Sequence, residues 1–287
     1  MIVKLDYNEN DKGILIDYLN ETDADFGVPL SQKIDFASFA EKILSKGHVY
    51  MVSEDNTYCA MICFYCNDII EKKAYLPILS TKACARGKGY ARLLIMHMIN
   101  ICSLYKMKHI LCDSINPIAI SIYKSFGFKT YKETCDNGIR KEYLIKDIAE
   151  ISSQTIVDFL QQIDNDYTPS LSTKISLQDY SEKIKTLGHV IIDSCKDCIH
   201  GIAVIYCNDS ETQKAYIPLV GVSKEFSGQG VAKRIVKELI YFAKYKNFKV
   251  IGIHSNKSVS IKIYQSLGFV VVGNPQDGRY YMELEIN

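Results

Sequence analysis

The sequence contains no tryptophan, only six prolines and no apolar run that approaches the ~18 residues of a membrane span. Its charges almost cancel: 34 Lys and Arg residues stand against 33 Asp and Glu residues, which leaves a formal net charge of +1. Proteins that hold nucleic acid through its phosphates need a basic face, so this balance argues against that class of partner. The hydrophobic content of 47% is that of an ordinary globular chain. We therefore expect neither nucleic acid nor a membrane as a partner.

The first residues lack the charged segment followed by an apolar segment that marks an export signal. Without such a signal, the ten cysteines are expected to be reduced thiols in the cytoplasm rather than disulfides. Cys195 and Cys198, with His200 after them, form a single Cys pair, and a hairpin turn explains this spacing better than a metal site. No metal is expected, and nothing in the sequence indicates an oligomeric state.

What the chain does contain is a second copy of its own first half. Gly89 recurs as Gly230 and Tyr123 recurs as Tyr264, each 141 positions further on (230 − 89 and 264 − 123). The constant spacing means that the copies run together without insertion or deletion. A unit of this length is large enough to bury its own core, so the repeat predicts two tandem copies of one domain rather than a solenoid.

The joint between the copies falls within 142–148, and we expect one domain at 1–146 and the other at 147–287. No Gly-, Pro- or Ser-rich linker separates them. A shift of 141 positions maps 143–148 onto 2–7, so the last strand of the first copy takes the place of the first strand of the second. Either this strand serves both sheets, or the second copy lacks its first strand.

Periodicity predicts the same order of elements in each copy. In the first copy, strands are expected at 2–7, 48–53, 59–66, 75–80, 109–113, 129–131 and 141–145, and helices at 12–20, 36–45, 89–105 and 118–126. This order indicates an α/β fold in which each copy forms a mixed, mostly antiparallel sheet flanked by helices.

One segment of each copy carries a chemical signal, because a strand runs into a glycine-bearing turn that opens a long helix. In the first copy the turn reads Arg86-Gly87-Lys88-Gly89. The glycines allow backbone N–H groups to converge, and the helix N-terminus adds positive potential, which together suit a pyrophosphate. Glycines before a helix also serve plain strand–helix packing, so this feature alone is a weak signal.

The wider pattern is more specific. Arg-x-x-Gly-x-Ala at 86–91 follows a strand, and Asn116-Pro117 and Tyr123-Lys-Ser-Phe-Gly127-Phe128 follow about thirty residues later. This combination resembles the GNAT superfamily of acyl-CoA-dependent N-acetyltransferases, over essentially both copies. The resemblance implies a GNAT-like (acyl-CoA N-acyltransferase) fold, acetyl-CoA as the acyl donor, and direct attack of a small-molecule amine on the thioester.

The resemblance also implies roles for individual residues. Tyr123 and Tyr264 would be the general acids that protonate the leaving thiolate. The cofactor-binding residues that it implies are Leu79, Thr81, Arg86, Gly87, Lys88, Gly89, Tyr90, Ala91 and Asn116 in the first copy, and Val220, Val222, Gly228, Gln229, Gly230, Val231 and Ala232 in the second. Ser227 stands where the first copy has Arg86, and Lys257 where it has Asn116. We therefore expect tighter acetyl-CoA binding in the first copy.

Both copies depart from the family at the general base. Many relatives carry a glutamate on the central strand, and that position here is Pro77 in the first copy and Pro218 in the second. The base is left open. Replacement candidates are Asp68, Asp209, Asp113 and His254, or an ordered water without a strong base.

The segment between the first two helices often lines the acceptor pocket in this family. The acceptor-side candidates are Asp25, Ser31 and Lys33 with their counterparts Asp166, Ser172 and Lys174, together with Asp68 and Asp209 at a strand end. An aspartate there suits a cationic amine, and the serine or lysine suits a hydroxyl or phosphate. The alternative is a turn in which Ser31 and Ser172 act as helix N-caps and the aspartates only shape the loop.

Three functions fit these features. The leading one is an acetyl-CoA-dependent N-acetyltransferase that acts on a small amine. The second is a non-catalytic acyl-CoA-binding or regulatory protein, favoured by the missing glutamate and opposed by the two tyrosines. The third combines one catalytic and one scaffolding domain. Amino sugar, amino acid, polyamine and antibiotic all remain open as acceptors.

Overall fold

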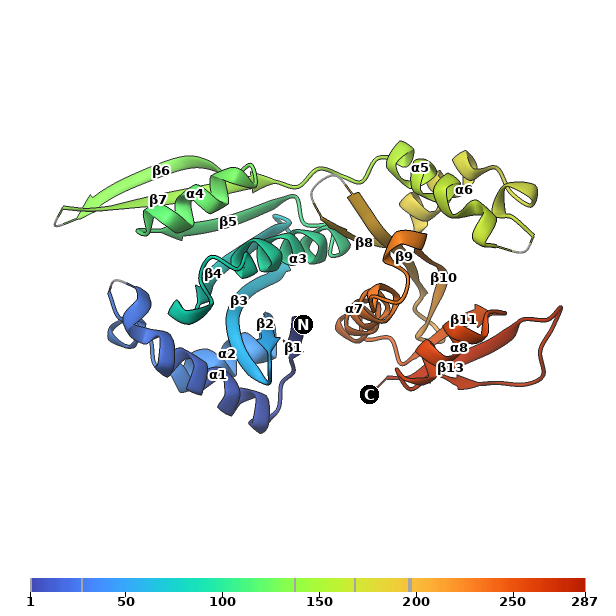
Figure 1. Ribbon diagram of the computed structural model, residues 1–287, viewed down its shortest axis with the longest axis horizontal. Coiled ribbons are helices and arrows are strands. Elements are labelled where there is room, and N and C mark those ends of the chain that lie inside the picture. The colour runs from blue at the N-terminus through green and yellow to red at the C-terminus, as the bar shows by residue number, and fades with distance from the viewer. Residues whose placement is uncertain (1, 27, 137, 168, 196–197, 287) are drawn as a thin grey trace. The chain divides into compact units, whose positions relative to one another are not determined.

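The structure is a computed structural model that describes residues 2–26, 28–136, 138–167, 169–195 and 198–286. The chain forms two compact units (Figure 1). Unit 1 holds Met1–Cys102 and Lys106–Ala149, and unit 2 holds Ser103–Tyr105 and Glu150–Asn287. We refer to unit 1 as the first domain and to unit 2 as the second domain.

The first domain is built on one mixed sheet of seven strands in the order β1-β2-β3-β4-β5-β7-β6. Its strands are β1 (Ile2–Leu5), β2 (His48–Glu54), β3 (Thr57–Asp68), β4 (Lys73–Thr81), β5 (His109–Ser114), β6 (Lys129–Asp136) and β7 (Ile139–Asp147). Its helices are α1 (Glu9–Thr22), α2 (Phe36–Lys46), α3 (Tyr90–Leu104) and α4 (Pro117–Ser125). β4 and β5 run parallel, and the other neighbouring strands described are antiparallel.

Helices cover both faces of this sheet, as the alternation along β3 requires. Leu19 of α1 and Ile43 of α2 pack against Met61 and Cys63 of β3 in one fully buried cluster. On the other face, His97 of α3 meets the ring of Tyr50 edge-on, with 4.4 Å between ring centroids. The strands therefore present a helix-covered face to each side, which leaves the strand ends and edges as the places where a ligand can bind.

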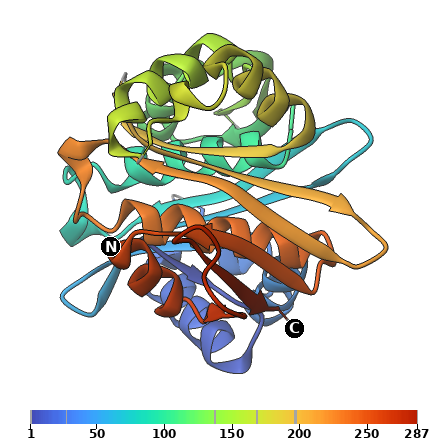
Figure 2. The same cartoon turned by 90° about the vertical axis from the view of Figure 1, so that its right-hand side faces the viewer.

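The second domain repeats this plan with six strands in the order β12-β13-β11-β10-β9-β8. Its elements are α5 (Ser153–Ile163), α6 (Leu177–Leu187), β8 (His189–Cys195), β9 (Cys198–Asp209), β10 (Lys214–Val222), α7 (Val231–Tyr245), β11 (Val250–Ser255), α8 (Ser258–Gln265), β12 (Val270–Val271) and β13 (Tyr280–Glu285). Figure 2 faces this domain and shows α5 and α6 (yellow-green) on one side of the sheet and α7 (orange) on the other. The predicted α/β class and the mixed sheets are confirmed.

The structure decides how the joint between the copies is made. β7 pairs with β5 and β6 of the first sheet, from His109↔Asp147 to Ser114↔Glu142 on one side and from Lys129↔Ile145 on the other. Both of its edges are thus committed to one sheet, and the described second sheet ends at β8. Of the two alternatives for 142–148, the structure shows the second: the strand belongs to the first sheet, and among the described residues the second sheet has no counterpart of β1.

The predicted turn at Cys195–Cys198 includes residues 196 and 197, which lie outside the described part of the chain. Among the described residues, no group of His, Cys, Asp and Glu side chains is placed to hold a metal ion, and no helix is long and apolar enough to cross a membrane.

Candidate functional site

The sheet of the first domain opens at a defined point between β4 and β5. The two parallel strands pair from Lys73↔His109 to Leu76↔Cys112, although both continue beyond this point. Pro77 is the next residue of β4, and proline has no N–H with which to continue the ladder. The backbone of β4 from Pro77 to Thr81 is therefore freed on this side.

Proline also marks an irregularity on the other side of β4. The antiparallel register with β3 shifts between Cys63↔Ile78 and Tyr65↔Tyr75, so one residue of β3 faces two of β4. Such a β-bulge is one of the few places within a sheet that tolerates proline. The second domain has the same shift and the same loss of pairing around Pro218, where β10 and β11 stop pairing at Ile217↔Ile253. The residue that stands at the expected glutamate position thus shapes the opening.

The freed edge presents hydrogen-bonding groups that the sheet does not use. The carbonyl of Thr81 accepts a hydrogen bond from Nε of Arg86 at 3.3 Å. In the second domain the carbonyl of Val220 accepts one from the hydroxyl of Tyr167 at 3.2 Å. Oγ1 of Thr81 is buried and makes no hydrogen bond to any described residue. A buried polar atom without a partner is costly, so this edge suits a polar ligand that extends along the strand.

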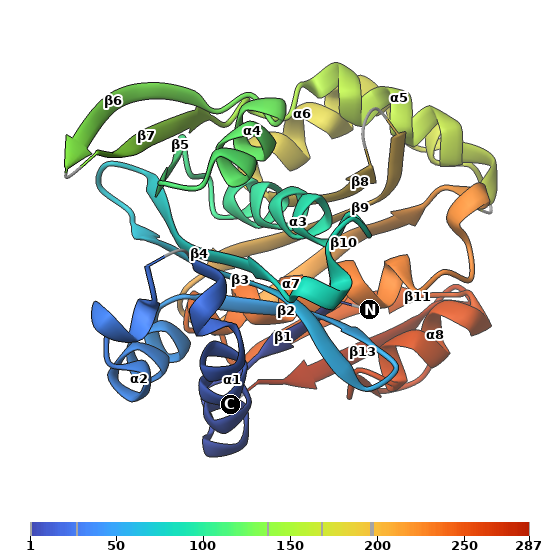
Figure 3. The same ribbon diagram turned by 60° about the vertical axis from the view of Figure 1, so that its left-hand side comes forward.

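A glycine turn joins β4 to α3 at the end of this edge (Figure 3). Gly87 and Gly89 both have φ of +82°, a backbone conformation that other residues adopt only with strain. A Cβ atom at either position would meet no atom within 4 Å, so the space in front of the turn is open. The turn leads into the N-terminus of the 15-residue helix α3, where backbone N–H groups favour an anion. The residues present therefore fit a pyrophosphate group.

Arg86 ties this turn to the loop after α1. Its guanidinium lies 2.9 Å from the carboxylate of Asp25, one of the predicted acceptor-side residues. Lys88 is paired with Glu54 at 2.7 Å, and both of these ion pairs are substantially exposed. The pairs orient two cations beside the turn without burying them, so the cations stay available to a phosphate.

The second domain keeps the turn and loses its cation. Gly228 and Gly230 have φ of +79° and +75°, and open space lies in front of both. Ser227 replaces the arginine, so no charged partner for Asp166 corresponds to the first domain's pair.

Asn116, predicted to touch the cofactor, caps α4. Its Oδ1 accepts hydrogen bonds from the N–H groups of Ile118 at 2.9 Å and Ala119 at 3.3 Å. Lys257 at the corresponding position of α8 makes no such side-chain bond. The asparagine therefore has a structural role that its replacement gives up.

Both predicted general acids lie buried on the helix after the parallel strand. Tyr123 and Tyr264 are each 5% exposed. Burial, with a smaller contribution from Cys112 and Asp113, raises the pKa of Tyr123 far above its usual value. Burial likewise raises the pKa of Tyr264 to about 12. Each phenol therefore holds its proton at neutral pH and is able to donate it.

A tyrosine on the central strand contacts the neighbouring parallel strand in both domains. The hydroxyl of Tyr75 donates to Asp113 at 2.8 Å, and Lys141 lies 2.6 Å from the same carboxylate. In the second domain, Tyr216 and His254 take these places, with 3.0 Å between the hydroxyl and Nδ1. Burial, aided by Arg279, lowers the pKa of His254. Of the proposed bases, Asp113 is thus already held by two partners, whereas His254 is neutral at pH 7.

Four of the acceptor-side candidates shape loops. Ser31 donates to Asp23 at 2.5 Å, and Ser172 donates to Asp164 at 2.5 Å. The interpretation of Ser31 and Ser172 as N-caps is wrong, because α2 and α6 are capped by Asp35 and Ser176. The other two, Asp68 and Asp209, accept backbone N–H bonds within the hairpin turns after β3 and β9. Lys33 and Lys174 are exposed.

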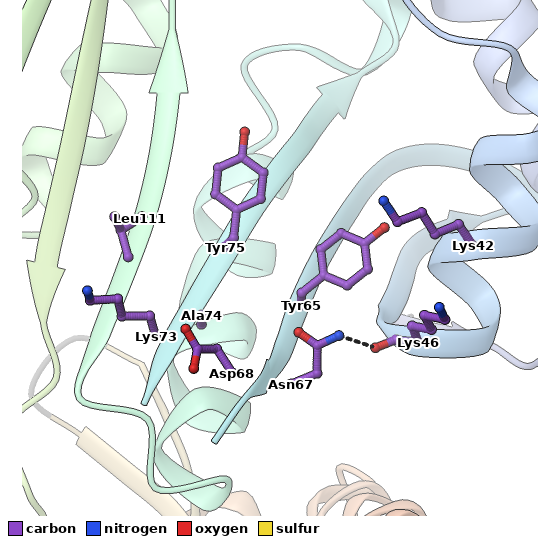
Figure 4. A pocket seen from close by; sticks show the side chains of 9 residues that line it. All are labelled: Lys42, Lys46, Tyr65, Asn67, Asp68, Lys73, Ala74, Tyr75 and Leu111. Atoms are coloured by element: carbon purple, nitrogen blue, oxygen red, sulfur yellow. Dashed lines mark hydrogen bonds between the residues drawn. The ribbon is translucent and has the colours of Figure 1, made fainter. Parts of the chain in front are cut away.

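The first domain also has a cavity of about 360 Å³ on the sheet face that α2 covers (Figure 4). Its lining residues are Lys42, Lys46, Tyr65, Asn67, Asp68, Lys73, Ala74, Tyr75 and Leu111. Tyr75 precedes Leu76, the last residue of β4 that pairs with β5, so the cavity adjoins the opening of the sheet. Of the predicted acceptor-side residues, this cavity includes Asp68. Tyr65 and Tyr75 recur as Tyr206 and Tyr216, and this repeat is the sequence signal that could have indicated the cavity.

The second domain differs at two positions that correspond to parts of this site. Gly252 stands where Leu111 lines the cavity, and a Cβ there would come within 2.4 Å of the Tyr281 hydroxyl. The hydroxyl of Tyr167 hydrogen-bonds to the Val220 carbonyl, and the centroid of its ring lies 5.0 Å from Nζ of Lys257. Phe26 takes the place of Tyr167 in the first domain and has no hydroxyl. The carbonyl of Val220 is thus held by a tyrosine hydroxyl in the second domain. In the first domain, the carbonyls of Ser80 and Thr81 accept bonds from Tyr18 and Arg86.

Two family models match segments of the chain. The family model described as "Acetyltransferase (GNAT) family" matches residues 15–128, and the model described as "Acetyltransferase (GNAT) domain" matches residues 158–281. A comparison with curated proteins gives no match.

Solved structures with a similar fold include a putative GNAT-family acetyltransferase from Desulfovibrio desulfuricans, with 14% identity and a TM-score of 0.43, covering 52% of this chain and 100% of its own. The ribosomal-protein-S18-alanine N-acetyltransferase of Escherichia coli has 13% identity and a TM-score of 0.43, with coverage of 53% and 97%. A GNAT family acetyltransferase from Elizabethkingia anophelis with acetyl-CoA bound has 20% identity and a TM-score of 0.33, with coverage of 38% and 82%. The two matched segments together span most of the chain, which belongs to the GNAT acetyltransferase superfamily and carries two GNAT domains in tandem.

Proposed function

We propose that the first domain transfers an acetyl group from acetyl-CoA to a primary amine of a small molecule, and that the second domain has lost this activity. The observation that carries the proposal is the continuity of three features in one domain. The open edge of β4 leads at one end to the Gly87–Gly89 turn, and at the other end to the cavity beside Tyr75. A donor and an acceptor placed there would meet next to Leu76.

The residues of the first domain would divide the binding of acetyl-CoA among them. Backbone groups of Leu79 and Thr81 would pair with the amide groups of the pantetheine arm. The N–H groups at Gly87–Ala91, with Arg86 and Lys88, would hold the pyrophosphate. Preorganised N–H groups at a helix N-terminus need no rearrangement when the anion binds, which favours both affinity and alignment.

In the reaction, the lone pair of the neutral amine attacks the thioester carbonyl carbon, the new C–N bond forms and the C–S bond breaks. The nitrogen loses a proton to solvent, and the Tyr123 hydroxyl gives its proton to the departing sulfur and regains one from solvent. No carboxylate stands at Pro77, and Asp113 is held by Tyr75 and Lys141. The amine therefore reacts from the fraction that is already neutral, without a strong protein base.

The second domain fits a structural or regulatory role better. Tyr167 hydrogen-bonds to the carbonyl that the pantetheine arm would use, and Tyr281 takes the place of the Leu111 side chain, which lines the cavity of the first domain. Ser227 adds no positive charge to the phosphate turn.

The test is release of free thiol from acetyl-CoA by the full-length protein, measured against a panel of amines. Tyr123→Phe should lower kcat about ten- to a thousandfold with little change in acetyl-CoA affinity. Tyr264→Phe is the matched control in the second domain and should leave kcat unchanged. If the protein binds acetyl-CoA but no amine of the panel causes release of thiol, the result would favour a non-catalytic acyl-CoA-binding protein instead.

A further inference from the structure

The charge of the cavity beside Tyr75 bears on which amine enters it. Three of its nine lining residues are lysines and one is an aspartate. Figure 4 shows Lys42 and Lys46 approaching from α2 on one side and Lys73 on the opposite side, with the two tyrosines between them. A cation that binds a protein site is normally matched by carboxylates, and this lining offers the opposite charge.

The aspartate does not reverse this balance. Oδ1 of Asp68 accepts the N–H of Glu71 at 2.9 Å within the hairpin turn. Lys73 is paired with Glu71 at 3.1 Å. Lys42 and Lys46 form no ion pair with a described residue, so they remain two uncompensated charges on one wall.

Ordinary structural roles explain only part of this arrangement. Lys46 lies in the last turn of α2, where a cation interacts favourably with the helix dipole. Lys42 lies one turn earlier and lacks that explanation. The side-chain amide of Asn67 is held by the Lys46 carbonyl at 3.4 Å, and this bond recurs in the second domain between Asn208 and Leu187 at 3.0 Å. The asparagine therefore fixes the wall in both domains. Lys42 recurs as Lys183, whereas Leu187 stands at the position of Lys46, so only the first domain carries both charges.

We infer that the acceptor of the first domain carries an anionic group, a carboxylate or a phosphate, in addition to its reactive amine. This inference rests on the proposed acetyl transfer. Lys42 and Lys46 bind the anion on the α2 side of the cavity, and the amine points past Tyr75 toward the opening after Leu76. Polyamines and other polycations are excluded as preferred acceptors.

The same lysines assist the chemistry that the missing glutamate would have served. A positive charge near an amine disfavours its protonated form, so a cationic cavity increases the neutral fraction that attacks the thioester. An anionic group on the acceptor is held while its amine remains reactive. Cationic lining and the absence of a strong base are thus consistent parts of one site.

The experiment uses the full-length protein, acetyl-CoA and matched amine pairs. O-phosphoethanolamine is compared with ethanolamine for the phosphate, β-alanine with β-alaninamide for the carboxylate, and spermidine represents the polycations. The ratio of kcat/KM for the charged over the neutral member is measured in the wild type and in Lys42→Gln/Lys46→Gln. Because each ratio is compared between proteins, differences in intrinsic amine reactivity cancel.

We expect the wild type to prefer one anionic member, and the double variant to lose about ten- to hundredfold of that preference, as one or two charged hydrogen bonds are removed. The phosphate and carboxylate pairs identify which anion is used. Lys183→Gln, at the position of Lys42 in the second domain, should leave the ratio unchanged. If turnover is as fast with neutral amines, or fastest with spermidine, the inferred acceptor class is wrong and the proposed acetyl transfer still stands. If none of the amines causes release of thiol, both proposals are refuted.

Discussion

Gly89→Ala tests the phosphate turn, because the structure separates its effect on folding from its effect on binding. Gly89 has φ of +82°, and no atom lies within 4 Å of the Cβ that alanine would add. The substitution therefore causes backbone strain without a clash. Gly230→Ala in the second domain is a matched control, since its φ is +75° and its surroundings are equally open.

The strain of an L-residue in this region is about 1–2 kcal/mol. For a domain of roughly 150 residues, each kcal/mol shifts Tm by about 2–4 °C, so both variants should lose about 2–8 °C. Binding should respond in one variant only. A methyl group in front of the N–H groups of the first turn removes one or two charge-assisted hydrogen bonds to phosphate, which predicts a ten- to hundredfold weaker Kd for acetyl-CoA in Gly89→Ala.

Isothermal titration calorimetry of acetyl-CoA and thermal unfolding of the same samples measure the two effects. The wild type should show one tight site, which Gly230→Ala leaves intact. If Gly230→Ala weakens the tight site and Gly89→Ala does not, the donor site lies in the second domain and the assignment is reversed. If neither variant changes Kd, the glycine turn does not hold the pyrophosphate.

Three further predictions address other parts of the chain. Tyr167→Ala frees the Val220 carbonyl, and calorimetry should then detect a second, weaker acetyl-CoA site. Phe26→Ala, at the matching position of the first domain, should add no site. An unchanged stoichiometry in Tyr167→Ala would show that the tyrosine does not block the edge. The value of log(kcat/KM) should rise with pH with unit slope up to the pKa of the acceptor amine, and Asp113→Asn should keep that profile, since the carboxylate is held by Tyr75 and Lys141; a lost acidic limb in Asp113→Asn would identify Asp113 as the base. Burial, with Lys4 and His97, lowers the pKa of His48 well below its usual value. The contribution of neutral His48 to the free energy of unfolding is therefore complete above about pH 6.5, and it falls by up to about 1.4 kcal/mol per pH unit below that. Urea unfolding at pH 7 and pH 5 should show a smaller pH dependence in His48→Phe than in the wild type, and an equal dependence would assign the acid sensitivity to other groups.

The sequence was sufficient where local pattern and the repeat determine the structure. The element order, the mixed sheets and the glycine turn all follow from residues that act on their near neighbours or recur at fixed spacing. The resemblance assigned Leu79 and Thr81 to the cofactor, although Pro77 was interpreted as a lost base rather than as a cause of the opening. Ser31 was misassigned because its partner Asp23 is contacted across a loop, while the true cap of α2 is Asp35.

Features that depend on distant side chains were not predictable in this way. Tyr167 and Val220 are separated by 53 positions, and Tyr281 approaches Gly252 from another strand. The shared strand was a reasonable interpretation of the period, yet the choice of sheet for 142–148 depends on tertiary pairing, which a repeat distance does not encode. Lys42 and Lys46 carried no motif, and only the cavity relates them to Tyr75.

The break in pairing at Pro77 and Pro218 also bears on how binding and divergence proceed. Because the missing N–H is a covalent property of the chain, the edge of β4 is separated from β5 before any ligand arrives, and acetyl-CoA does not have to break strand hydrogen bonds to enter. The same permanence leaves the second domain with exposed carbonyls whether or not it binds a nucleotide. Under the proposed assignment, a tyrosine that hydrogen-bonds to such a carbonyl stabilises the second domain, which does not need to keep this edge free for acetyl-CoA.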